Sequence, residues 1–102
     1  MTRSVILSEA KNLMKHFNIT VSGKVQGVFY RQSTLEIANQ FGINGFVKNG
    51  TNGNVCIEAE GEEAELKKLI DWCKKGPSRA VVSEVKISEG ELKNFSEFSI
   101  KR

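Results

Sequence analysis

The segment GKVQGVFYR, from Gly23 to Arg31, joins an expected strand to an expected helix and could bind an anion. Gly23 and Gly27 permit the positive φ or the close approach by which backbone N–H groups turn inward to form a concave nest. The helix N-terminus adds partial positive charge, which favours a phosphate. Arg31 can hold two phosphate oxygens through its planar guanidinium group. A glycine-bearing connection is often only a connection, and an arginine at a helix start is often only solvated, so this loop alone does not establish a site.

Other common catalytic arrangements either lack a required residue or have their residues at positions that predict a structural role. His16 is the only histidine, and its position on the polar side of a strand predicts a solvent-facing side chain, which leaves no Ser-His-Asp triad. Glu58 and Glu60 share one strand face, and the acidic group at 62–65 fits a helix N-terminus. Val28 stands where a Walker-type phosphate loop needs glycine. No His/Cys cluster has metal-ligand spacing, so we expect neither metal nor cofactor.

Hydrophobic periodicity predicts seven elements that would position this loop. In chain order they are a strand at 16–22, a helix beginning between Phe29 and Ser33, strands at 44–49 and 54–60, a helix at 62–75, a strand at 81–87 and a short strand at 98–101. Ser33 and Glu36 form a candidate capping box for the first helix. The order β-α-β-β-α-β with a short fifth strand predicts an α+β, ferredoxin-like fold, with two helices on one face of an antiparallel sheet.

Two Asn-Gly pairs lie between the two middle strands, in the stretch VKNGTNGNV. Either pair can supply the positive φ angles of a tight hairpin. If Asn52-Gly53 makes the turn, Asn49 stays at the end of its strand with its amide free to face the loop. If Asn49-Gly50 makes the turn, that amide is used in local backbone bonding. The residues themselves leave both arrangements open.

The composition is typical of a globular domain of 102 residues, with 39% hydrophobic and 26% charged residues. The net charge of +3 is scattered, which argues against a nucleic-acid footprint but mildly favours small anionic substrates. No apolar run approaches the roughly 18 residues of a membrane span. Cys56 and Cys73 lie on separate expected elements, which favours free thiols in a reducing cytoplasm.

The patterned sequence occupies residues 16–102, which we expect to form one domain. Residues 1–15 are expected to be an N-terminal extension outside it. Three interpretations of this extension stay open: a frayed, disordered segment, an appended helical turn, or residues upstream of a start codon at Met14.

The segments GKVQGVFYR, GFVKNGTNGNV and FSIKR together resemble the acylphosphatases, small ferredoxin-like hydrolases, over His16 to Arg102. The resemblance implies that Arg31 and the loop bind the phosphoryl group, that Asn49 orients the attacking water, and that Asn52-Gly53 makes the turn. The implied phosphate-binding residues are Gly23, Gln26, Gly27, Val28, Phe29, Tyr30 and Arg31. Gly50 departs from the family, where threonine or a similar residue is common, and this affects a secondary hydrogen bond.

The resemblance implies metal-independent hydrolysis of acyl phosphates to a carboxylate and inorganic phosphate by a monomer. A carboxylate leaves without a proton from a general acid, which agrees with the lack of a catalytic histidine. One alternative is a non-catalytic phosphate-binding or regulatory module, which would use the same loop. Another is an RNA-binding domain of the same element order, but Asn44 and Asn49 occupy positions where stacking aromatic residues are needed, and Phe46 is expected in the core.

Overall fold

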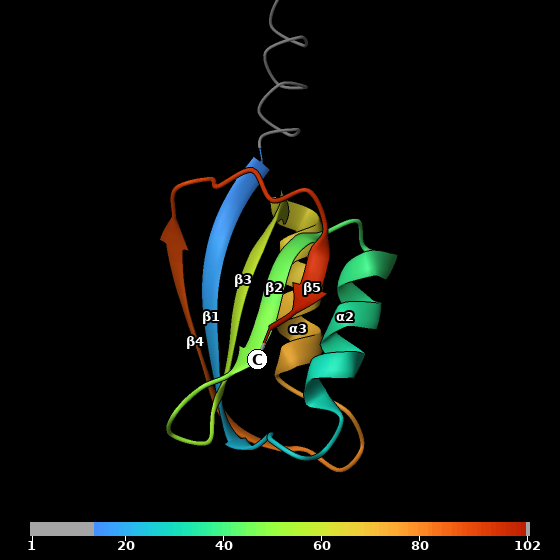
Figure 1. The fold of residues 1–102 in the computed structure, drawn as a ribbon, viewed down its shortest axis with the longest axis vertical. Helices are drawn as coiled ribbons and strands as arrows, with labels where there is room; N and C mark the ends of the chain where they lie inside the picture. The colour runs from blue at the N-terminus through green and yellow to red at the C-terminus, as the bar shows by residue number, and fades with distance from the viewer. Residues whose placement is uncertain (1–13, 102) are drawn as a thin grey trace, which may run out of the picture.

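The structure is a computed structural model that describes residues 14–101, and it contains one sheet and two helices (Figure 1). The elements are β1 (Met14–Lys24), α2 (Tyr30–Gln40), β2 (Asn44–Asn49), β3 (Val55–Glu62), α3 (Glu63–Cys73), β4 (Val81–Gly90) and β5 (Phe98–Ile100). The sheet order is β4-β1-β3-β2-β5. The ferredoxin-like prediction is confirmed, although the sheet is not wholly antiparallel, because β5 pairs parallel to β2.

Both helices pack on the same face of the sheet, with α3 against β3 and β1 and α2 against β2 and β5 (Figure 1). Strand alternation explains this layer. Ile19 and Val21 of β1 and Ile57 of β3 face the helices and are at most 1% exposed. Leu66 and Leu69 of α3 cover them and are fully buried. Each such side chain contributes roughly 1.5–3 kcal/mol through burial, so the helical face of the sheet holds the fold together.

The first strand begins at Met14, before the expected start at residue 16, because Met14 pairs with Glu62 at the far end of β3. The expectations for residues 1–13 lie outside the part of the chain that the structure describes. β4 also continues beyond its expected end, to Gly90, since His16 pairs with that residue. The periodicity therefore located these strands but underestimated their lengths.

The helix ends differ from two predictions. The first helix begins at Tyr30, within the expected range, but Phe29 and not Ser33 is its N-cap, so the predicted capping box is wrong. The N–H of Ser33 instead donates to the Phe29 carbonyl within the helix, at 3.0 Å. The second helix ends at Cys73, so the following lysines lie beyond its last turn, which contains no basic residue. Within residues 14–101, each helix is too short or too polar to cross a membrane.

His16 is buried, which corrects the prediction of a solvent-facing side chain. It lies on the sheet face opposite the helices, as the alternation indicates, but segment 91–97 covers that face and leaves it 1% exposed. Its Nδ1 lies 2.8 Å from Oε2 of Glu60, and its ring packs against Phe95, with a centroid distance of 6.0 Å. Glu60 also accepts hydrogen bonds from the backbone N–H groups of Lys93 and Phe95. These bonds attach segment 91–97 to the sheet.

The buried carboxylate of Glu60 is expected to make stability fall in acid. Burial raises the pKa of Glu60, but hydrogen bonds from Lys93, His16 and Phe95 outweigh it and lower the pKa below its ordinary value of 4.5. The folded state therefore binds fewer protons than the unfolded state, so this stabilisation is complete above about pH 4.5 and is lost as pH falls through the lower folded pKa. We expect Glu60→Gln to lose about 1–3 kcal/mol at neutral pH and to flatten the acid side of a Tm-against-pH curve.

The matched control is Glu84→Gln, because Glu84 is exposed on β4. Thermal unfolding of this variant should follow the wild-type curve from neutral pH to pH 3. An acid side that is equally steep in Glu60→Gln and the wild type would contradict the role given to Glu60.

Candidate active site

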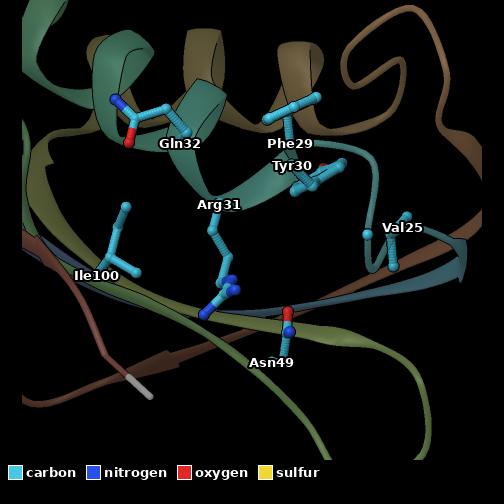
Figure 2. Close-up of a pocket in the computed structure, with 8 residues that line it drawn as sticks. Val25, Phe29, Tyr30, Arg31, Gln32, Asn49 and Ile100 are labelled. Atoms are coloured by element: carbon cyan, nitrogen blue, oxygen red, sulfur yellow. The ribbon is translucent and has the colours of Figure 1, made fainter.

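A cavity of about 410 Å³ lies at the end of the sheet where β1 leads into α2 and where β2 ends (Figure 2). Its lining residues come from three separate parts of the chain: the β1–α2 connection with the first turn of α2, the end of β2, and β5. They are Val25, Gly27, Phe29, Tyr30, Arg31, Gln32, Asn49 and Ile100. The fold therefore brings the glycine-containing loop and Asn49 to one site.

Arg31 extends from the first turn of α2 into this cavity. Figure 2 shows its guanidinium group and the carboxamide of Asn49 pointing toward one another from opposite sides. Among the residues that the structure describes, no ion pair joins Arg31 to an acidic side chain. A half-buried guanidinium group without a carboxylate partner attracts an anion, and its planar N–H groups fit two oxygens of a phosphate.

Asn49 is the last residue of β2 and pairs with Val55. Its Oδ1 atom is buried and has no hydrogen-bond partner within residues 14–101. An unpaired buried carbonyl oxygen costs about 1–3 kcal/mol, and most such atoms in proteins have a partner. The carboxamide of Asn49 is therefore suited to accept a hydrogen bond from a water or ligand in the cavity.

The connection after Asn49 answers the question of the two Asn-Gly pairs. The N–H of Gly50 donates to the Asn54 carbonyl at 2.7 Å, which closes a loop of five residues. Gly53 has φ +82°, whereas Asn52 is not among the described residues with positive φ. Asn49 thus stays in its strand as predicted, but the turn is not the two-residue type in which both residues of Asn52-Gly53 have positive φ.

Gln26 connects the two halves of the site through its side chain. Its Nε2 donates to the carbonyls of Gly50 and Asn54, at 3.0 and 2.9 Å. These two carbonyls flank the turn that follows Asn49. Gln26 therefore fixes the β1–α2 loop against the β2–β3 turn, which sequence reasoning missed because it considered only the backbone of Gln26.

The other predicted loop residues divide into two groups. Gly27 lines the cavity with φ +75°, and a Cβ there would meet nothing within 4 Å, so glycine serves the backbone conformation. Gly23 lies outside the lining, and its φ of +126° accompanies close packing against β4, where a Cβ would collide with the Val81 carbonyl. Val28 is also outside the lining, with its side chain 5% exposed in the core.

The first turn of α2 is fixed beneath the cavity by Tyr30. Its hydroxyl donates to the Cys73 carbonyl at 2.8 Å, its ring packs against Trp72, and its own carbonyl accepts a hydrogen bond from Thr34 at 2.7 Å. Burial raises the pKa of the Tyr30 phenol, so it stays a neutral donor. Burial also raises the pKa of the Cys73 thiol to about 12, which excludes a nucleophilic thiolate at neutral pH. These side-chain contacts fix the first turn of α2, which carries Arg31.

Three lining residues were not predicted from the sequence: Val25, Gln32 and Ile100. Ile100 reaches the cavity because β5 lies beside β2, with Ile100 paired to Val47. A terminal apolar residue gives no local signal of such a position. No group of three or more His, Cys, Asp or Glu side chains that could hold a metal ion occurs in the described part of the chain.

Known proteins resemble this chain in both sequence and fold. The acylphosphatase family profile matches residues 17–100. The chain is 50% identical over 76 residues to an acylphosphatase of Marinobacter nauticus, an alignment that covers 74% of this chain and 83% of the relative.

Solved structures give the same likeness. An acylphosphatase from Coxiella burnetii has a TM-score of 0.85 and 38% identity, covering 89% of this chain and 95% of the other. An acylphosphatase from Bacillus subtilis has a TM-score of 0.84 and 32% identity, covering 88% of this chain and 100% of the other. The similarity therefore extends over the fold and the segments that form the cavity.

Proposed function

The chain belongs to the acylphosphatase family, and from that premise we propose that its cavity hydrolyses acyl phosphates without a metal, with Arg31 holding the phosphoryl group and Asn49 orienting the water. One observation carries this assignment. The buried, unpartnered Oδ1 of Asn49 shares a cavity with a guanidinium group that has no ion-pair partner among residues 14–101. The first group needs a hydrogen-bond donor and the second needs an anion.

The phosphoryl group binds between Arg31 and the backbone N–H groups of the segment 26–30. Arg31 donates to two of its oxygens, and the N–H groups near Gly27 and at the start of α2 neutralise the rest of the charge. Positive φ angles at Gly27 and Phe29 support this part of the proposal, because such a backbone turns successive N–H groups to one side. Gly23 is left out, since its close contact with β4 explains the glycine there.

The reaction is an in-line displacement at phosphorus. A water donates one hydrogen bond to Oδ1 of Asn49 and directs a lone pair at phosphorus, opposite the carboxylate oxygen. The new P–O bond forms as the bond from phosphorus to the carboxylate oxygen breaks, and the carboxylate leaves with the electron pair. The water's proton passes to a phosphate oxygen of the substrate. Arg31 offsets charge on the phosphoryl oxygens throughout.

A binding module without turnover is the second candidate, because it would use the same cavity. The RNA-binding alternative needs an exposed aromatic ring on which a base can stack, but Phe46 is only 8% exposed. Phe95 packs edge-on against the Phe46 ring, and the Nζ of Lys101 lies 4.2 Å from the centroid of that ring. We also propose that the protein is a monomer. We further propose that it works in a reducing cytoplasm, which the free thiols of Cys56 and Cys73 support.

Incubation with benzoyl phosphate or acetyl phosphate in the presence of EDTA tests the function. We expect stoichiometric release of carboxylate and inorganic phosphate, with no loss of rate on chelation. Asn49→Ala is the control that removes the proposed water ligand. Binding of inorganic phosphate by the wild type without hydrolysis of either substrate would favour the binding module.

A further inference from the structure

Phe29 occupies a position that its backbone disfavours. It is the N-cap of α2 with φ +64°, the left-handed region that a bulky side chain rarely adopts. Asn94 is the other non-glycine residue with positive φ among residues 14–101, and asparagine tolerates this region. Glycine or asparagine would suit both the φ angle and the N-cap at Phe29. The backbone alone therefore does not explain a phenylalanine.

Core packing does not explain it either. Phe29 is 75% exposed, whereas its neighbours Val28 and Tyr30 are 5% and 1% exposed. Phe29 is nevertheless one of the residues that line the cavity that contains Arg31 and Asn49. Phe29 thus combines a strained backbone with a large, exposed apolar side chain at the edge of a cavity. This combination is more consistent with contact to a ligand than with a role in folding.

The size of the cavity leaves room for more than a phosphoryl group. Its volume of about 410 Å³ falls within the range of roughly 300–1,000 Å³ that is typical of pockets for whole organic ligands. Its polar side chains are those of Arg31, Asn49 and Gln32, of which Arg31 and Asn49 face one another, and the apolar residues Val25, Phe29 and Ile100 also line it. The site thus combines a polar centre with apolar surroundings.

The in-line geometry of the displacement indicates on which side of the cavity the acyl group lies. The leaving carboxylate lies on the side of phosphorus opposite the water that Asn49 orients. Figure 2 shows Asn49 on the sheet side of the cavity and Phe29 on the opposite side, at the loop before α2, with its ring turned away from Asn49 and Arg31. The acyl group that departs from phosphorus is therefore directed out of the cavity, past the loop that carries Phe29.

We propose that the Phe29 side chain is the binding platform for the acyl group, and that the enzyme prefers acyl phosphates with an aromatic or bulky apolar acyl group to acetyl phosphate. This inference rests on the proposed function and adds the substrate class. The ring contacts the acyl group alone and takes no part in binding phosphate, which is the task of the backbone. An aromatic acyl group can stack on the ring, whereas a methyl group covers little of it.

The test compares kcat/KM for benzoyl and acetyl phosphate in the wild type, Phe29→Asn and Phe29→Tyr. Asparagine removes the ring while suiting both the φ angle and the N-cap, so we expect this variant to fold with a higher Tm. Its benzoyl-to-acetyl ratio of kcat/KM should fall about tenfold, mainly through a higher KM for benzoyl phosphate. Phe29→Tyr keeps the ring and should keep the ratio. Val81→Ala, which removes an exposed apolar side chain on β4, should also keep it.

Binding measurements separate this proposal from the proposed function. Calorimetry with benzylphosphonate and methylphosphonate needs no turnover. We expect the wild type to bind benzylphosphonate more tightly and Phe29→Asn to lose that preference. If the wild type hydrolyses neither acyl phosphate, the proposed function fails. A loss of the preference for benzylphosphonate in Phe29→Asn would still support Phe29 as the binding platform. Equal ratios in the wild type and Phe29→Asn, in hydrolysis or in phosphonate binding, would overturn it.

Discussion

Asn49→Ala is expected to lower kcat for acyl phosphate hydrolysis by a factor of about 10² to 10⁴, the usual loss when a group that positions a reactant is removed. The fold should persist, because the carboxamide oxygen has no hydrogen-bond partner among the described residues. The affinity for inorganic phosphate should change little, since Arg31 and the loop amides are intact. Steady-state kinetics, product inhibition by phosphate and thermal unfolding measure these three effects.

Asn52→Ala is the matched control, because Asn52 is exposed in the same β2–β3 turn and lies outside the cavity lining. It should keep wild-type kinetics. Wild-type turnover in Asn49→Ala would refute the role given to Asn49. A marked fall in Tm together with the fall in kcat would indicate a structural role instead.

Arg31→Lys is expected to reduce kcat/KM by at least about 10², although the charge is unchanged. Lysine presents one compact ammonium group and cannot donate two parallel hydrogen bonds to phosphate oxygens. Unlike Asn49→Ala, this variant should also bind inorganic phosphate more weakly. Inhibition by phosphate therefore distinguishes the two proposed roles, which are holding the phosphoryl group for Arg31 and orienting the water for Asn49.

Arg79→Lys supplies the same chemical change at an exposed position in the α3–β4 connection. It should leave both kcat/KM and phosphate inhibition at wild-type values. Phosphate inhibition of Arg31→Lys that matches the wild type would exclude Arg31 as the phosphate ligand.

The sequence predicted most sharply the strand whose ends carry local turn signals. The strand Asn44–Asn49 was predicted with its observed bounds, because its ends are marked by Gly42 before it and by the asparagine-glycine turn after it. The capping box at Ser33 failed because the N-cap is set by how the loop packs at the site. The burial of His16 also escaped prediction, since it depends on segment 91–97, which is distant in sequence.

For the site, Arg31 could be identified from its position after the glycine loop, but its neighbour across the cavity could not. Nothing local in the stretch around Asn49 shows that β2 ends opposite α2, and the family resemblance supplied that pairing. The hydrogen bonds of Gln26 to the turn and the place of Ile100 follow from strand order. Both features depend on how the strands assemble into a sheet, so the hydrophobic periodicity of the sequence cannot predict them.

The strand order has a consequence for synthesis on the ribosome. β1 lies between β3 and β4, and its edge facing β4 is completed only when Val81–Gly90 has been made. Until then the first strand lacks one of its two neighbours. The residues that pair between β1 and β4 are separated by most of the sequence of the domain. Contacts so far apart in sequence slow folding and lengthen the time during which a nascent chain is exposed to aggregation. The order of strands that assembles the cavity thus also delays its completion until the last strands of the domain have been made.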